Sequence, residues 1–190
     1  MRVWLASQST RRAEMLGQIF PNLTCKGIDS VDETSSAADV SRKVLEICQK
    51  KASAVTNNSN FDLVIVSDTM LQDPDVDVLA MGKANDAIEA AAMLHRLSGR
   101  RHRVWSATGV CYRGSWEFHL NQAIVEFDEL SDEVLVELVL SNSWVGKAGS
   151  YDLAGEMGEY ARLVEGDEAT VLGIASDAMS RLVELSDYET

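Results

Sequence analysis

The sequence predicts an α/β fold in which helices are layered on a mixed sheet. Strand-like apolar runs alternate with helix-like segments along the 190 residues, a pattern typical of layered α/β domains. Residues 63–66, Leu-Val-Ile-Val, form a continuous apolar run rich in β-branched side chains, as expected of a strand buried on both faces. Residues 104–112 and 116–127 have the composition of two long strands, and the turn signal at residues 113–115 favours an antiparallel pair.

The chain opens with a short strand and a helix. Val3–Ala6 is an apolar run of strand length, and residues 7–10 form a polar turn after it. Ser9 or Thr10 is a natural N-cap for the helix that follows. Apolar residues of this helix recur at helical spacing, at Met15, Leu16 and Ile19.

Residues 35–56 predict a longer helix, with Ser35 or Ser36 as its cap. Its apolar residues fall on one stripe, made of Val40, Val44, Cys48, Ala52 and Val55. Residues 57–60, Asn-Asn-Ser-Asn, are expected to end this helix in a turn. After the strand at 63–66, the tripeptide Ser-Asp-Thr at 67–69 is placed at the C-terminal end of that strand.

The middle of the chain predicts a loop, a short strand and a helix. Residues 71–75 contain a proline and two acids, which break any regular pattern and favour a loop. A strand is expected near residues 76–81. Residues 85–97 form an Ala-rich helix, and Ser98-Gly99 is a typical signal for its end.

The predicted antiparallel pair is followed by helical and loop segments. Ser131 is expected to cap a helix, and residues 146–158 form a glycine-containing loop region. A last helix is expected over residues 174–185. The helix after Ser131 carries an apolar set made of Val134, Leu135, Leu138 and Val139.

Composition bounds the class of protein. We expect one domain, residues 1–190, with 17 basic residues against 30 acidic ones and a net charge of −13. Such a charge repels nucleic acid polymers and anionic membranes, so a phosphorylated ligand requires locally concentrated cations. The three cysteines form no C-x-x-C pair and no apolar run reaches membrane length, which together indicate a cytoplasmic protein.

The first candidate site is the string Ser7-x-Ser9-Thr10-Arg11-Arg12, between a strand and a helix. A helix N-terminus offers free N–H groups that suit phosphate, and two arginines add fork-shaped donors. The alternative is a capped surface helix with solvated arginines, which is the more frequent case for such short strings.

Two acidic residues are candidates for metal binding or acid–base chemistry. Asp68 follows the most apolar strand, and ligands of α/β sheets bind beyond the carboxyl ends of strands. A carboxylate there can hold Mg²⁺ or act as a general base, although an Asx turn or a helix cap is an equal alternative. Glu33 is a candidate for a second metal-binding carboxylate, or else a solvated loop acid.

Two lysines and a tyrosine complete the candidates. Lys51 shares the apolar stripe of its helix, so it either snorkels past the core edge or reaches a site. Lys83 precedes a helix and can point at an anion. Tyr151 ends the string Lys147-Ala148-Gly149-Ser150-Tyr151 and can stack or hydrogen-bond, although an ordinary turn is the alternative.

Taken in order along the chain, these strings resemble the motifs of the Maf family, and they cover nearly the whole chain. Residues 5–12 are similar to the S-x-S-P-R-R opening, 32–34 to D-E-[ST], 51–52 to K-A, 67–69 to A-D-T, 82–84 to G-K-P, 94–104 to M-L-x-x-L-S-G-x-x-H-x-V, 147–151 to K-A-G-A-Y and 165–167 to E-G-D.

The resemblance implies a fold shared with Maf and inosine-triphosphatase-like proteins, with an elongated mixed sheet and a cleft between two lobes. It implies hydrolysis of the α–β phosphoanhydride of a non-standard, modified or surplus nucleoside triphosphate. Asp68 would be the general base, and Glu33 and Asp68 would lie near a divalent metal, Mg²⁺ or Mn²⁺. The triphosphate would be held by Arg11, Arg12, Lys51 and Lys83 with Ser7 and Ser9, and Arg11 and Thr69 match positions linked to base preference.

The sequence also departs from the family pattern. Thr10 and Ala84 replace prolines without changing a charged contact, whereas residues 152–155 read Asp-Leu-Ala-Gly where the family has G-I-Q-G or an acidic variant. Ala154 cannot hydrogen-bond a base through its side chain, so the preferred base stays open. The family implies a possible homodimer. The alternative function is a nucleotide-binding regulator of cell division with little hydrolysis.

Overall fold

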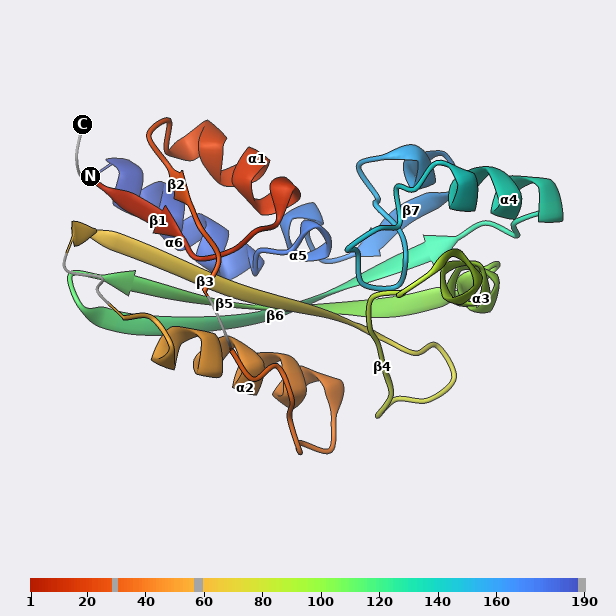
Figure 1. The fold of residues 1–190 in the computed structure, drawn as a ribbon, viewed down its shortest axis with the longest axis horizontal. Helices are drawn as coiled ribbons and strands as arrows, with labels where there is room; N and C mark the ends of the chain where they lie inside the picture. Colours follow the sequence, from red (N-terminus) through yellow and green to blue (C-terminus); the bar gives the residue numbers. More distant parts are fainter. Residues whose placement is uncertain (29–30, 57–59, 188–190) are drawn as a thin grey trace.

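The protein is built around an elongated mixed sheet, seen in a computed structural model that describes residues 1–28, 31–56 and 60–187 (Figure 1). Its strands follow the order β2-β1-β3-β5-β6-β7, and β4 pairs with β3. β1 pairs in parallel with β2 and β3, whereas β3, β5, β6 and β7 pair antiparallel. The strands are β1 (Val3–Leu5), β2 (Thr24–Cys25), β3 (Leu63–Gln72), β4 (Ala80–Met81), β5 (Arg101–Tyr112), β6 (Ser115–Phe127) and β7 (Ala161–Glu165).

Helices cover both faces of this sheet. Figure 1 shows α1, α5 and α6 on one face and α2 on the other, with α3 and α4 at the far end of the long strands. This arrangement confirms the predicted α/β class. The helices are α1 (Thr10–Ile19), α2 (Val40–Ser53), α3 (Ala87–Leu97), α4 (Asp132–Leu140), α5 (Glu168–Leu172) and α6 (Ser176–Asp187), with a 3₁₀ helix η2 (Glu156–Glu159).

The helix caps agree with the sequence in two places and differ in one. Ser9 caps α1 and Ser131 caps α4, as predicted. The predicted cap of α2 is wrong, because Asp39 accepts the hydrogen bond from the Arg42 amide and the helix begins only at Val40. Ser35 instead donates its hydroxyl to Glu46, at 2.5 Å. The turn predicted at residues 57–60 lies mostly outside the described residues.

Strand β3 is longer than predicted. It runs to Gln72, so Asp68 lies within the strand, opposite Ala107 of β5, and not at its end. The loop predicted at 71–75 is therefore wrong for its first two residues, because backbone pairing with β5 continues through them. The strand predicted near 76–81 is reduced to Ala80–Met81.

The buried residues form three apolar clusters that leave a gap in the middle of the sheet. One lies between the sheet and α1 and α6, a second joins the sheet to α3 and α4, and a third lies under α2. Buried polar residues of β3 and β5 lie between these clusters: Ser67, Asp68, Ser106 and Thr108. Buried polar side chains need hydrogen-bond partners, which are either one another or a ligand.

Candidate active site

A cleft crosses the centre of the molecule and contains every side chain predicted from the sequence to bind substrate or metal. It consists of two adjoining pockets of about 760 Å³ and 1070 Å³, measured with their open mouths. Both pockets are lined by Ser9, Arg12, Lys51, Lys83, Gly146 and Lys147, so they form one continuous cleft.

The two ends of the cleft differ in chemistry. We call one end the polar arm, lined by Ser7, Gln8, Ser9, Thr10 and Glu33. We call the other the apolar arm, lined by Leu71, Val104, Tyr151, Leu153, Val171 and Leu172, with Arg11, Asp68, Thr69 and Asp152 at its polar positions. The cleft therefore suits a ligand with a charged part and an apolar part.

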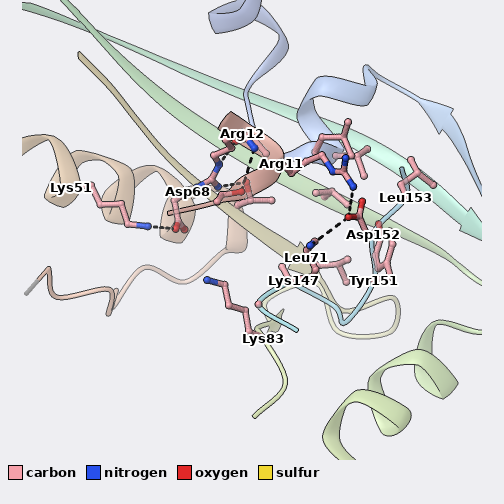
Figure 2. Close-up of a pocket in the computed structure, with 18 residues that line it drawn as sticks. Arg11, Arg12, Lys51, Asp68, Leu71, Lys83, Lys147, Tyr151, Asp152 and Leu153 are labelled. Atoms are coloured by element: carbon pink, nitrogen blue, oxygen red, sulfur yellow. Dashed lines mark hydrogen bonds and ion pairs between the residues drawn. The ribbon is translucent and has the colours of Figure 1, made fainter. Parts of the chain in front are cut away.

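Arg12 is held rigidly at the junction of the two arms. Its guanidinium donates to the Gly173 carbonyl at 2.8 Å and the Thr69 hydroxyl at 3.0 Å (Figure 2). It also donates to the Ser67 carbonyl and the Ser7 hydroxyl, each at 3.2 Å. Burial lowers the pKa of Arg12, and nearby Asp68 opposes this shift. With most of its donors committed to the protein, Arg12 presents a fixed positive charge to the cleft.

Further hydrogen bonds from hydroxyl groups hold the acceptors of Arg12 in place. Thr69 contacts the Ser106 hydroxyl at 2.8 Å, and Ser67 donates to the Gly173 carbonyl at 2.7 Å. Gly173 has φ +115°, and a Cβ there would lie 2.9 Å from Nε of Arg12. Only glycine therefore allows Arg12 this close approach.

Lys51 joins two carboxylates on the other side of the junction. Its Nζ lies 2.7 Å from Oδ1 of Asp68 and 3.0 Å from Oε1 of Glu33. Asp68 and Lys51 are nearly buried, with 12% and 13% of their side chains exposed, whereas Glu33 is 57% exposed. The helical stripe thus brings Lys51 into the cleft, where its ammonium contacts both acids.

The same geometry tests whether the acids fit a divalent metal. Glu33 and Asp68 both contact the Lys51 ammonium, so their carboxylates lie near each other in the cleft, and Mg²⁺ is commonly held by one or two carboxylates together with substrate phosphates. The donor set therefore fits such an ion. Within the described residues, no group of three or more His, Cys, Asp or Glu side chains is placed to hold a metal by itself.

Lys83 reaches the cleft from the segment after β4. The Gly149 amide donates to the Gly82 carbonyl at 2.9 Å, and Lys83 pairs as an isolated bridge with Ala148. Gly149 has φ +67°, and a Cβ there would lie 2.7 Å from Cδ1 of Leu71. In the described part of the chain Lys83 makes no ion pair, so its ammonium is available to an anion.

Arg11 faces the apolar arm and not the polar arm. It donates through NH2 to Oδ2 of Asp152 at 2.6 Å and through NH1 to Glu14 at 2.7 Å. Lys147 places its Nζ 3.5 Å from the same Oδ2 of Asp152. Two residues that the sequence did not identify as site residues, Lys147 and Asp152, thus belong to the cleft.

Tyr151 lines the apolar arm through its ring, while its hydroxyl points into the core. The hydroxyl lies 2.8 Å from Nε2 of His102, and both rings contact Phe127 edge-on. Burial raises the pKa of Tyr151 and lowers that of His102 to about 3. Any contact of Tyr151 with a ligand therefore involves the ring.

The signals for the two missed residues differ. Lys147 begins the string that ends in Tyr151, and a lysine beside two glycines in an acidic chain was a visible clue. Asp152 pairs with Arg11 across 141 positions of sequence, and no local pattern announces such a contact.

Fold and cleft together define an α/β protein whose basic and acidic side chains converge on one central site. The chain belongs to the Maf family: the sequence profile described as Maf-like protein matches residues 2–185. This confirms the resemblance seen in the sequence. No helix in the described ranges is both long and apolar enough to cross a membrane.

Similar proteins of known name match nearly the whole chain. It is 30% identical over 185 residues to a dTTP/UTP pyrophosphatase of Pyrococcus horikoshii, covering 97% of each chain. It is 33% identical over 187 residues to a dTTP/UTP pyrophosphatase of a Ruegeria species, covering 97% of this chain and 94% of that one. Among solved structures, the Ham1 protein of Staphylococcus aureus matches with a TM-score of 0.47 and 17% identity, over 67% of this chain and 72% of that one.

Proposed function

We propose that this protein hydrolyses the α–β phosphoanhydride of a nucleoside triphosphate to a nucleoside monophosphate and pyrophosphate. By its family and its named relatives the chain is a nucleotide pyrophosphatase, a hydrolase that acts on acid anhydrides. The names of the relatives favour dTTP and UTP as substrates, present in surplus or as modified forms. The observation that carries the proposal is the convergence of Lys51, Asp68 and Glu33 beside Arg12 in one cleft.

The two arms orient the substrate. The triphosphate lies along the polar arm, where free N–H groups at the start of α1 and the ammonium of Lys83 meet anionic oxygens. Arg12 and Lys51 at the junction add positive charge where the polyphosphate is most negative. The base enters the apolar arm, whose leucines and valines suit a flat ring.

Asp68 is the proposed general base. Its Oδ1 accepts from Lys51, and its Oδ2 has no hydrogen-bond partner among the residues that the structure describes. Asp68 takes a proton from water, the water oxygen bonds to the α-phosphorus, and the bond from this phosphorus to the bridging oxygen breaks. The electron pair of that bond leaves with pyrophosphate.

Glu33 and Asp68 would hold a divalent metal, Mg²⁺ or Mn²⁺, with the phosphate oxygens of the substrate as further ligands. A bound metal of this kind neutralises phosphate charge and polarises the oxygens around the reacting phosphorus. Arg12 and Lys83 stabilise the negative charge that develops on the leaving pyrophosphate, and electrostatic terms of this kind usually dominate phosphoryl transfer.

A turnover assay tests this function. The purified protein is offered normal and modified nucleoside triphosphates with Mg²⁺ or Mn²⁺, and pyrophosphate and phosphate are measured separately. We expect pyrophosphate release that a chelator abolishes and added metal restores. A protein that binds nucleotides yet hydrolyses none of them would instead support the regulator of cell division.

The variant Asp68→Asn tests the mechanism. Loss of the general base should lower kcat by about 10²–10⁴-fold while the binding of a non-hydrolysable analogue is largely retained. Asp62→Asn is the matched control, because Asp62 pairs with Arg2 outside the cleft. Full activity of Asp68→Asn would show that Asp68 is not the base.

A further inference from the structure

Asp152 forms a charged triad with Arg11 and Lys147 at the wall of the apolar arm. Figure 2 shows its carboxylate between the two cations, with Oδ2 2.6 Å from NH2 of Arg11 and 3.5 Å from Nζ of Lys147. Asp152 is 8% exposed and lines the pocket together with both partners. A buried carboxylate needs such partners, because an unpaired buried charge is costly.

The triad has hydrogen-bonding capacity that the protein does not use. NH1 and NH2 of Arg11 carry two N–H groups each, and within the described residues each makes one side-chain hydrogen bond, to Glu14 and to Asp152. Oδ1 of Asp152 accepts one bond, from the Ala154 amide at 3.1 Å, and a carboxylate oxygen can accept a second. The Lys147 ammonium has three donors, and among the residues that the structure describes it makes only the long contact to Asp152.

We propose that this triad reads the base of the substrate as a donor–acceptor–donor pattern. The pattern is complementary to the imide edge of uracil or thymine, which presents an oxygen acceptor, an N–H donor and a second oxygen acceptor. Arg11 and Lys147 donate to the two carbonyl oxygens, and the Asp152 carboxylate accepts the ring N–H. This inference rests on the proposed function and names the residues that select its substrate.

The other bases fit the triad poorly. Cytosine places an amino donor against a cation and a ring-nitrogen lone pair against the Asp152 carboxylate, and adenine does the same. Guanine donates its ring N–H to Asp152 but directs its amino group at the second cation. Each mismatch leaves buried polar groups unpaired, which is how hydrogen-bonding sites reject wrong substrates.

The neighbouring residues support this assignment. Leu153 and Leu71 line the same arm, so apolar surface for a ring lies beside the charged triad. Ala154 has no side-chain hydrogen-bonding group, and Asp152, two residues earlier, offers a carboxylate acceptor.

The test is the ratio of kcat/KM for UTP to that for CTP, measured in the wild type and in Asp152→Asn. We expect the wild type to prefer UTP, and the variant to lose at least about tenfold of this preference while its rate on CTP rises. The reason is that an asparagine amide can donate to the ring nitrogen of cytosine, which the carboxylate cannot. Asp128→Asn, a surface acid paired with Arg162, is the matched control and should keep the wild-type ratio.

The outcomes separate this inference from the proposed function. Equal losses on UTP and CTP in Asp152→Asn would show a merely structural role and overturn the inference. A wild type that cleaves CTP or a purine nucleotide as well as UTP would overturn it too, while the proposed function would stand. A wild type that cleaves no nucleoside triphosphate would contradict the proposed function itself.

A second variant, studied in a binding assay, tests the inference without relying on Asp152→Asn alone or on measured turnover. Lys147→Met removes one donor of the triad, so calorimetry should show weaker binding of UMP with little change for CMP. Retention of the wild-type ratio of UMP to CMP affinity in both variants would overturn the inference.

Discussion

Nζ of Lys51 lies 2.7 Å from Oδ1 of Asp68, a contact that ties the last turn of α2 to the middle of β3. The same ammonium lies 3.0 Å from Glu33, which comes from the segment before α2. The adjacent Lys50 points elsewhere, to Asp32 on the surface. Two consecutive residues of α2 therefore point in different directions, Lys51 into the cleft and Lys50 toward solvent. The different effects expected of substituting them can be tested.

Lys51→Met should lower both activity and stability. Removing the ammonium leaves Asp68 without its ion-pair partner. It also leaves the repulsion between Asp68 and Glu33 without a compensating positive charge. We expect kcat/KM to fall by about 10²-fold and the free energy of unfolding to fall by about 1–3 kcal/mol. Lys50→Met is the control and should change the unfolding free energy by less than about 0.5 kcal/mol. Similar effects of the two variants in denaturant melts and turnover assays would contradict the assigned role of Lys51.

Arg12→Lys should impair the site although the positive charge is retained. A lysine cannot reproduce the planar fork that reaches Gly173, Ser67, Ser7 and Thr69. We expect a loss of about 1–3 kcal/mol in unfolding free energy and at least about tenfold in kcat/KM. Arg42→Lys, at an arginine that is 76% exposed, should behave like the wild type in both assays. A wild-type melting curve for Arg12→Lys would mean that charge alone matters at this position.

His102 predicts a specific dependence of stability on pH. Burial lowers its pKa to about 3 in the folded protein from an ordinary value of 6.5, so the unfolded chain binds a proton first as the pH falls. The contribution of neutral His102 to the free energy of unfolding is therefore fully present above pH 6.5. It is lost at roughly 1.4 kcal/mol per pH unit as the pH falls toward 3.

The variant His102→Gln isolates this effect, since glutamine can still hydrogen-bond Tyr151 but does not titrate. The difference in unfolding free energy between wild type and variant should shrink as the pH is lowered from 6 to 4, measured by denaturant melts. His95→Gln, on the exposed side of α3, serves as the control. A difference that stays constant over this range would show that His102 is not buried in its neutral form.

Two glycines should respond in opposite ways to the same substitution. Gly149→Ala forces a side chain at φ +67° and against Leu71, so we expect a loss of more than about 1 kcal/mol in unfolding free energy. It should also weaken substrate binding, because this turn holds Lys83 and Lys147. Gly17→Ala, within α1 and with no atom within 4 Å of the new Cβ, should stabilise by about 0.5–1 kcal/mol. Thermal melts that rank the two variants the other way would contradict this account of the turn.

Much of the fold could be predicted because it depends on local patterns. The apolar run at 63–66 marked the central strand, and Ser9 and Ser131 marked helix starts through their capping oxygens. The end of β3 could not be predicted, since Gln72 belongs to the strand through its pairing with Arg103 of β5 and Ala80 of β4. The short elements β2, β7 and α5 were also missed, because an element of so few residues shows no recognisable hydrophobic periodicity.

The sequence by itself determined the family, the α/β class and most of the basic and acidic residues that line the cleft, because ordered motifs and hydrophobic periodicity are properties of the linear chain. The tertiary structure alone decided how these residues pair. It turned Arg11 toward Asp152, committed Arg12 to four protein acceptors and placed Lys51 between two acids. Such contacts join residues far apart in sequence, and their distances and burial are fixed only when the sheet and helices pack together.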